Sequence, residues 1–202
     1  RIHGSVHRHP RHEDEVEVHL KTITVEQRAE DFPITRKPHG PEFLLNNRHL
    51  WLRTKRQVAI QKIRDTITRA TVDYFASEGF IKIDSPIITA NACEGTTTLF
   101  PVDYFGDEAY LSQSGQLYLE AAIAAHGRVY DFGPVFRAER SKTRKHLTEF
   151  WMMDAEMAYV EHEGNLKLQE ELILFIIERV LSERQRELAD LERDVSKLEA
   201  IK

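Results

Sequence analysis

The residues best suited to chemistry in this chain lie within a stretch of about twenty positions. Phe-Arg-Ala-Glu at 136–139 is followed by a basic stretch, then by His-Leu-Thr-Glu-Phe-Trp at 146–151, and then by Asp154 and Glu156. We expect a strand, a basic loop and a return strand, which together bring a cation, two acids and an aromatic face to one point. A guanidinium binds phosphate, a carboxylate accepts a hydrogen bond from an exocyclic amine, and a flat ring stacks on a base. The pattern therefore predicts a site for a nucleoside triphosphate.

Other elements must position this hairpin, and the longest of them is a helix predicted over 54–78. Its apolar residues recur at intervals of three and four and form one stripe for packing: Ile60, Ile63, Ile67, Ala70 and Tyr74. Gly79 follows as a C-cap. We also expect a helix over 117–125, a kinked strand over 129–136, and a helical region over 164–201 that packs as a helix hairpin or on its own domain.

The first part of the chain has a different pattern. Within residues 1–32, apolar side chains alternate with charged ones, as in a half-buried antiparallel strand: Val16, Val18, Leu20 and Ile23. Prolines and a glycine then interrupt the pattern and indicate a linker over 33–53. Because so few strands cannot form a stable sheet alone, residues 1–32 are interpreted as the last strands of a small β-domain.

Composition excludes several classes of protein. The chain has 202 residues, 41% of them apolar and 30% charged, and a net charge of −5, so we expect a packed core and no global attraction to nucleic acid. Cys93 is the single cysteine, which rules out an internal disulfide and fits a reducing, cytoplasmic compartment. We expect it to be a small buried residue. No apolar run approaches the length of a membrane span.

Four histidines near the N-terminus invite a metal interpretation: His3, His7, His9 and His12. Histidines in a terminal segment, without cysteine or acidic partners at fixed spacing, rarely form a closed site. We therefore expect no protein-bound metal site in this chain.

Four segments together resemble class II aminoacyl-tRNA synthetases of the subgroup that contains the aspartate, asparagine and lysine enzymes. The long helix with the Gly-Phe and Ser-Pro pairs of 79–86 resembles the family's motif 1, and the Glu-Gly pair at 94–95 resembles its mobile substrate loop. The third segment is Gln-Ser-Gly-Gln-Leu-Tyr-Leu-Glu at 113–120, and the hairpin over 136–156 resembles motif 2. The resemblance covers roughly residues 40–200.

This resemblance implies an α+β fold, with part of the antiparallel-sheet class II catalytic core in residues 54–202. It also implies that residues 1–32 are the final strands of an OB-type anticodon-binding barrel. Family members carry a third motif, Gly-x-Gly-x-x-Arg, and no such pattern follows Glu156. We therefore expect the core to be incomplete and the chain to be an internal piece of a longer enzyme.

The third segment bears on the amino-acid substrate. Aspartate enzymes usually read Gln-Ser-Pro-Gln-Leu-Tyr-Lys there, and the lysine faces the substrate side-chain carboxylate. Here Leu119 stands at the matching position and Gly115 replaces the proline. Burying a carboxylate without a cation costs several kcal/mol, whereas a neutral amide needs no cation. The residues therefore favour asparagine, with tRNA(Asn) as the second substrate, and Trp151 also resembles the asparagine enzymes.

The resemblance implies a role for each matching residue. Arg137 is the expected catalytic residue, bridging the ATP α-phosphate and the amino-acid carboxylate. The ATP-binding set is Arg137, Glu139, Lys145, His146, Leu147 and Phe150, with Phe150 stacking on adenine. The amino-acid set is Glu94, Ser114, Gln116, Leu119, Arg137 and Asp154, and Pro86 lies in a homodimer interface. Mg²⁺ is expected to bridge phosphate oxygens.

Plainer interpretations stay open beside these. Arg137 and Glu139 could form a simple ion pair. Trp151 should point away from Phe150 in a strand, so we expect Trp151 in the core and Phe150 in the site. The whole protein could also be an asparagine synthetase-like paralogue, an aspartate-specific enzyme, or a non-catalytic dimerisation fragment.

Overall fold

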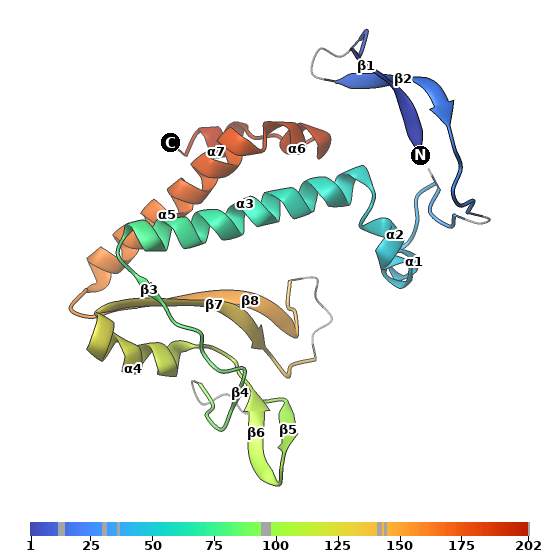
Figure 1. The fold of residues 1–202 in the computed structure, drawn as a ribbon. Coiled ribbons are helices and arrows are strands. Elements are labelled where there is room, and N and C mark those ends of the chain that lie inside the picture. Colours follow the sequence, from blue (N-terminus) through green and yellow to red (C-terminus); the bar gives the residue numbers. More distant parts are fainter. Residues whose placement is uncertain are drawn as a thin grey trace. The chain divides into compact units, whose positions relative to one another are not determined.

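The computed structural model describes residues 1–11, 15–29, 32–35, 37–93, 98–140, 143 and 145–201. The chain divides into two compact units, residues 1–57 and residues 58–202 (Figure 1). The division falls in the first turn of helix α3 (Lys55–Ser77). Among the described residues, no helix is both long and apolar enough to cross a membrane.

The first unit contains an antiparallel hairpin of β1 (Ile2–Arg8) and β2 (Val16–Ile23), followed by the short helices α1 (Pro41–Asn46) and α2 (Arg48–Trp51). The two helices lie in the segment that the sequence predicted to be a linker. Proline in the first turn of α1 is compatible with a helix, because the N–H that it lacks has no partner at that position.

Alternation along the hairpin separates two faces. Val6 pairs with Val18 on the apolar face, and His7 pairs with Glu17 on the polar face, where the His7 and His19 rings stack with centroids 4.1 Å apart. The prediction of a half-buried strand is wrong, because the apolar side chains of β2 are 42–67% exposed. Two strands alone cannot cover a face.

The second unit contains two three-stranded sheets. The first has the order β3 (Ile81–Lys82), β7 (Arg128–Phe136), β8 (Glu149–Met157), and the second has the order β4 (Ile88–Thr89), β6 (Asp107–Leu111), β5 (Pro101–Tyr104). All pairings are antiparallel except that between β3 and β7, which is parallel. The expected antiparallel sheet therefore needs a correction at β3, which enters from the end of α3 and runs in the same direction as β7.

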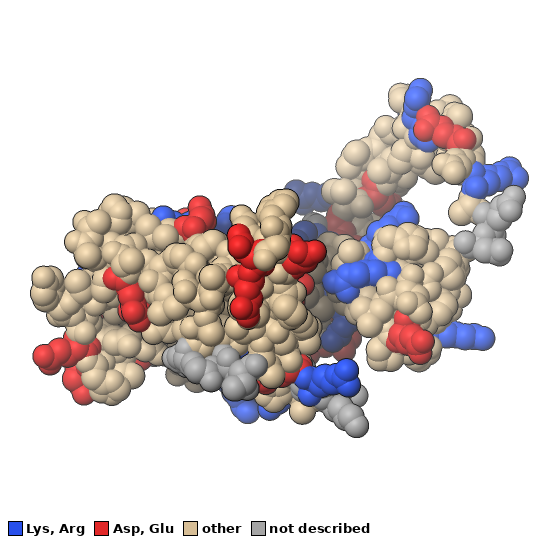
Figure 2. Space-filling view, turned by 90° about the horizontal axis from the view of Figure 1, so that it is seen from below, with Lys and Arg blue, Asp and Glu red and all other residues tan. Residues whose placement is uncertain are grey.

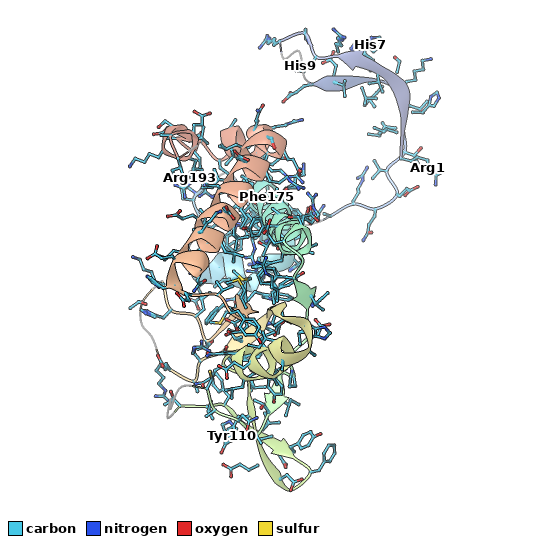
Figure 3. All side chains as sticks on the ribbon, turned by 90° about the vertical axis from the view of Figure 1, so that its left-hand side faces the viewer. Arg1, His7, His9, Tyr110, Phe175 and Arg193 are labelled. Carbon is cyan, nitrogen blue, oxygen red and sulfur yellow. The ribbon has the colours of Figure 1, made fainter. Side chains whose placement is uncertain are left out.

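Helices cover both faces of the β7–β8 hairpin (Figure 1). On one face, α3 and α5 (His162–Glu183) enclose the hydrophobic core, in which Phe175 of α5 lies at the border of the cluster (Figure 3). The buried members of this cluster are Tyr74, Phe75, Phe80, Tyr130, Leu168 and Leu172. The Phe75 and Tyr130 rings stack with centroids 4.7 Å apart. Helix α4 (Gln116–His126) contacts β7 and β8 from the other side.

The predicted helical region at the C-terminal end is divided into three helices. Helix α5 ends at Glu183, and α6 (Gln185–Asp190) and α7 (Ser196–Glu199) follow. The positive φ of 53° at Glu192 interrupts the helical path between α6 and α7. Lys62 of α3 donates a hydrogen bond to Glu187 of α6 at 2.9 Å, so α6 is held against α3.

Candidate functional site

The register of the β7–β8 hairpin decides which side chains share a face. Val135 pairs with Phe150 and Asp131 pairs with Asp154, and because directly paired residues point to the same side, these four lie on one face. Arg137 continues this face beyond the end of β7, where its N–H donates to the carbonyl of Thr148 at 2.9 Å. The apolar residues of the opposite face pack on the core under α3 and α5.

Arg137 and Phe150 meet on this face, as the sequence predicted. The Cζ atom of Arg137 lies 5.3 Å from the centroid of the Phe150 ring, within the range of a cation–π contact. Its Nη1 atom donates to the carbonyl of Phe136 at 3.1 Å and also to the carbonyl of Gln113. Within the part of the chain that the structure describes, Arg137 forms no ion pair, with Glu139 or any other acid. Its charge is therefore not offset by a described carboxylate.

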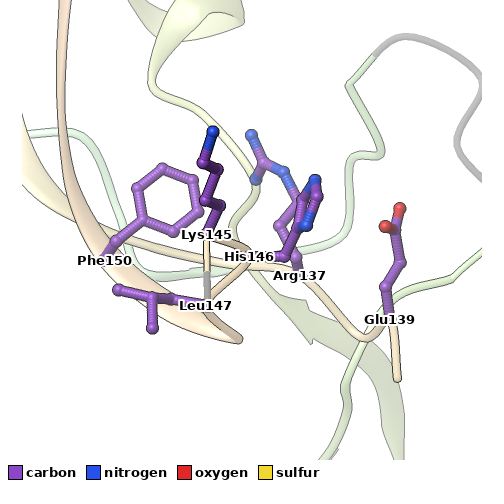
Figure 4. A pocket seen from close by; sticks show the side chains of 6 residues that line it. All are labelled: Arg137, Glu139, Lys145, His146, Leu147 and Phe150. Atoms are coloured by element: carbon purple, nitrogen blue, oxygen red, sulfur yellow. The ribbon is translucent and has the colours of Figure 1, made fainter. Parts of the chain in front are cut away.

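A cavity of about 390 Å³ opens beside this pair (Figure 4). Its described lining is Arg137, Glu139, Lys145, His146, Leu147 and Phe150, which is the set that the sequence assigned to ATP. Figure 4 shows the Arg137, Lys145 and Phe150 side chains close together, with Glu139 to one side. The cavity thus combines cationic groups, a carboxylate and an aromatic ring, and can accept a ligand with phosphate and a flat base.

A second cavity of about 290 Å³ lies beside the N-terminal end of α4. The described residues that line it are Cys93, Gln113, Ser114, Gln116, Arg137, Met152 and Asp154. Because Arg137 lines both cavities, its guanidinium lies where their contents would meet. The face seen in Figure 2 carries both acidic and basic side chains rather than charges of one sign.

Asp154 of β8 fixes the turn that begins α4. Its Oδ2 atom accepts hydrogen bonds from Ser114 Oγ at 2.9 Å and from the Gly115 N–H at 3.1 Å. The Gln116 N–H donates to Ser114 Oγ at 3.0 Å, and the Gln116 side chain donates to Glu120 at 3.0 Å. These hydrogen bonds therefore hold the polar residues of this segment in defined orientations.

Gly115 is required by close packing. A Cβ atom at this position would lie 2.6 Å from Asp131 Oδ2 and 2.7 Å from Ser85 Oγ, both far inside van der Waals contact. Ser85 Oγ is buried and has no hydrogen-bond partner in the described structure. The absence of a side chain at 115 lets the turn lie directly against β7.

Negative charge accumulates on the face of the β7–β8 hairpin that carries Asp131 and Asp154. Burial raises the pKa of Glu156, and the nearby carboxylates of Glu120 and Asp154 raise it further. Asp131 lies directly across from Asp154 on the neighbouring strand. The floor beneath the second cavity is therefore acidic, and Arg137 supplies the cation of its lining.

Some expectations need correction. Leu119 is completely buried and does not line the second cavity, because it packs on the inner side of α4. Trp151 points away from Phe150 as expected but is 59% exposed, so its prediction as a core residue is wrong. It lies near the start of β8, where the Phe132 ring, 5.4 Å away, is its aromatic neighbour. Glu94 lies outside the described residues.

Other residues of the site were not assigned from the sequence. Gln113 and Met152 line the second cavity, and so does Cys93, which is half-buried rather than core. Met152 could have been found from strand alternation alone, because it lies two residues from both Phe150 and Asp154. Pro86 is exposed in the connection between β3 and β4. Among the described residues, no group of three or more His, Cys, Asp or Glu side chains is placed to hold a metal ion.

Comparison with known proteins agrees with the features of the site. The model of the family described as "tRNA synthetases class II (D, K and N)" matches residues 40–202. The asparagine–tRNA ligase of Desulforamulus reducens is 54% identical over 202 residues, which is 100% of this chain and 47% of that protein. The asparagine–tRNA ligase of Sorangium cellulosum is 53% identical over 200 residues, covering 98% of this chain and 45% of that protein.

Solved structures agree in fold. Asparaginyl-tRNA synthetase from Pyrococcus horikoshii, complexed with asparaginyl-adenylate, superposes with a TM-score of 0.92 at 38% identity, covering 100% of this chain and 47% of that one. A putative aspartyl-tRNA synthetase from Leishmania major gives a TM-score of 0.78 at 30% identity, covering 94% of this chain and 40% of that one. The chain spans about half the length of the curated relatives it matches. The resemblance inferred from the motifs is confirmed, and this chain belongs to the class II tRNA synthetases of the D, K and N group.

Proposed function

We propose that the protein containing this chain activates asparagine with ATP and transfers it to the 3′ end of tRNA(Asn). The observation that carries the proposal is the position of Arg137, which lines both the cavity suited to a nucleotide and the cavity beside α4. Two anions, the α-phosphate and the amino-acid carboxylate, must approach each other in such a reaction. A planar guanidinium between them offsets the repulsion and orients both.

In the proposed first step, a carboxylate oxygen of asparagine attacks the α-phosphorus of ATP. A new P–O bond forms, the bond to the β-phosphate oxygen breaks, and pyrophosphate leaves with the electron pair. The nucleophile is already an anion and needs no general base, so the work of the protein is positioning and charge stabilisation. In the second step a ribose hydroxyl of the terminal tRNA adenosine attacks the adenylate carbonyl. An ester C–O bond forms, the bond from the carbonyl carbon to the phosphate oxygen breaks, and AMP leaves with the electron pair and takes up the hydroxyl proton.

Each lining residue has a part in this scheme. Phe150 stacks on adenine, Glu139 accepts from its exocyclic amine, and Lys145 and His146 hold the outer phosphates. Leu147 lines the same cavity. Ser114, Gln116 and Asp154 form the amino-acid side of the site, to which Glu94 of the preceding loop is assigned from the motif alone. Leu119 packs behind these residues and does not reach the amino-acid site, because it is fully buried.

Asparagine is proposed over aspartate on electrostatic grounds. Arg137 is the cation among the described residues that line the second cavity. In this scheme it binds the α-carboxylate. A second carboxylate would meet an acidic floor, whereas an amide carries no charge. The asparaginyl-adenylate in the Pyrococcus horikoshii relative supports the same choice.

We further propose the assembly that the motifs imply. Residues 1–32 are the last strands of an OB-type anticodon-binding domain, residues 33–53 connect it, and residues 54–202 belong to the catalytic domain. The protein acts as a cytoplasmic homodimer with Pro86 in the interface. Magnesium would be held chiefly by the phosphate oxygens of ATP and would supply charge neutralisation there.

ATP–pyrophosphate exchange by the full-length protein tests the proposal. Exchange that depends on asparagine, followed by charging of tRNA(Asn), is the expected result. Exchange driven only by aspartate would identify an aspartate-specific enzyme, and ammonia-dependent formation of asparagine from aspartate would identify a paralogue that makes the amino acid. No exchange with either amino acid would leave a non-catalytic dimerisation role.

A further inference from the structure

Helix α4 is hydrogen-bonded to both ends of the short segment 89–93, which leads from β4 to the second cavity. At one end, the Tyr118 hydroxyl of α4 and the Thr89 hydroxyl share a hydrogen bond of 2.7 Å. At the other end, Cys93 Sγ donates to Gln116 Oε1 at 3.6 Å. Two residues of one helix therefore hold the segment at its first and last positions.

Thr89 is the buried partner in this arrangement. It ends β4, pairs with Tyr110 of β6 and is only 6% exposed. Its Oγ1 atom also accepts a hydrogen bond from the Asn91 N–H at 3.1 Å, a contact between positions i and i+2 that is typical of a turn. Removal of the Tyr118 hydroxyl would leave a buried hydroxyl short of one partner, which is unfavourable away from water. The path of the chain after β4 therefore depends on α4.

The four bonded residues differ in their relation to the cavities. Cys93 and Gln116 line the second cavity, whereas Tyr118 and Thr89 are absent from the described lining of either cavity. Among the described residues that line the first cavity, none belongs to this group of four. A shift of segment 89–93 would therefore change the wall of the second cavity and leave the lining of the first cavity in place.

We propose that Tyr118 is a positioning residue for the amino-acid substrate: its bond to Thr89 holds segment 89–93 on α4 and so fixes the Cys93 part of the cavity wall. This inference rests on the proposed function, which places asparagine in the second cavity. Tyr118 touches no reacting atom and acts through Cys93. A wall that is already ordered lowers the entropy cost of binding, so the contact should strengthen binding of asparagine rather than accelerate the chemical step.

The test is ATP–pyrophosphate exchange by the full-length protein that carries Tyr118→Phe, a change that removes one hydroxyl and keeps the ring. We expect KM for asparagine to rise about fivefold, an order that the loss of one buried hydrogen bond supplies. The kcat and the KM for ATP should stay within about twofold of wild type, as expected when a change weakens binding of one substrate only.

Tyr110→Phe is the matched control. Tyr110 lies on β6 directly across from Thr89, its hydroxyl makes no hydrogen bond among the described residues, and it lines neither described cavity (Figure 3). Loss of this hydroxyl should leave both KM values within about twofold of wild type.

Thr89→Val tests the same contact from its other side. It should also raise KM for asparagine, by more than Tyr118→Phe does, because the Asn91 N–H loses its acceptor as well. If the two hydroxyls act through their shared bond, adding Tyr118→Phe to Thr89→Val should raise KM no further.

The place of the segment can be measured without turnover. Cys93 is half-buried in the cavity wall, so its alkylation by N-ethylmaleimide, followed by mass spectrometry of the peptide that contains it, reports how firmly the segment is held. Alkylation should be several-fold faster in Tyr118→Phe than in wild type and unchanged in Tyr110→Phe.

The outcomes separate this inference from the function on which it rests. Unchanged KM for asparagine and an unchanged alkylation rate of Cys93 in Tyr118→Phe would overturn the inference and leave the proposed function intact. Equal rises in the KM values for asparagine and ATP would indicate general damage to the fold and would also overturn it. Absence of asparagine-dependent exchange in the wild-type protein would instead refute the proposed function itself.

Discussion

Replacement of Gly115 by alanine is expected to destabilise the second unit by crowding the turn before α4. The added Cβ would lie 2.6 Å from Asp131 Oδ2, 2.7 Å from Ser85 Oγ and 3.3 Å from Asp131 Cβ. Non-bonded carbon and oxygen atoms do not approach so closely, so the turn or the strand beneath it must shift. Overpacking of this kind costs about 1–3 kcal/mol.

A double-mutant cycle between positions 115 and 131 can measure how much of this strain comes from contact with Asp131. Asp131→Ala removes one of the two colliding groups but leaves Ser85 Oγ, so the Gly115→Ala cost in that background should fall by about half. Gly133→Ala is the matched control, because its Cβ would meet only Asp131 Oδ1 at an ordinary 3.5 Å. That change should alter stability by no more than about 0.5 kcal/mol.

Urea unfolding followed by far-ultraviolet circular dichroism measures these differences, and thermal unfolding provides a second reading. A loss of about 2 kcal/mol corresponds to a fall in Tm of roughly 4–8 °C for a unit of this size. The reasoning is refuted if Gly115→Ala unfolds at the same urea concentration as wild type, or if Asp131→Ala leaves its cost unchanged.

Four shorter predictions follow from other contacts. Ser85→Ala should stabilise the fold by about 1 kcal/mol in urea unfolding, because Ser85 Oγ is buried without a described hydrogen-bond partner. Arg137→Lys should lower asparagine-dependent exchange about a hundredfold, since lysine keeps the charge but loses the planar fork. The hydrogen bond from Lys62 lowers the pKa of Glu187. The ionised Glu187 carboxylate therefore stabilises the fold above its unfolded pKa, and this stabilisation is lost as the pH falls through the lower folded pKa. Lys62→Met should cost about 1 kcal/mol at pH 7 and nothing in acid, as measured by urea unfolding at both pH values. Burial raises the pKa of Glu156, so its ionisation opposes folding above that pKa, and Glu156→Gln should raise Tm at pH 7 with a gain that disappears below the unfolded pKa.

The hairpin that carries the site could be predicted because it is determined by residues close together in the sequence. Strand alternation and a basic loop place Arg137 and Phe150 on one face without reference to the rest of the chain, and the register of the structure agrees. The same rule fails for Trp151, because alternation gives the direction of a side chain but not what covers it. Exposure of Trp151 depends on how far α3 and α5 extend over β8, which is a tertiary property.

Leu119 shows a different limit. Its position was read from a sequence match to a lysine that reaches the substrate, and the match says nothing about side-chain length or direction. A lysine can extend from an inner helix position to a cavity, whereas a leucine at that position ends within the core and is fully buried. The helices α1 and α2 were missed for a related reason, since prolines and a glycine indicate a break in a pattern but also begin helices.

Side chains from both arms of the hairpin bind the turn before α4, and this couples the two cavities. Arg137, beyond the end of β7, donates to the carbonyl of Gln113, and Asp154 on β8 accepts from Ser114 and Gly115. Because the hairpin is hydrogen-bonded to consecutive residues at the start of α4, the lining of the first cavity cannot move without the lining of the second. Precise approach of two reactants contributes strongly to rate, so a site built on one rigid hairpin and one clamped turn suits a reaction whose catalysis is chiefly positioning.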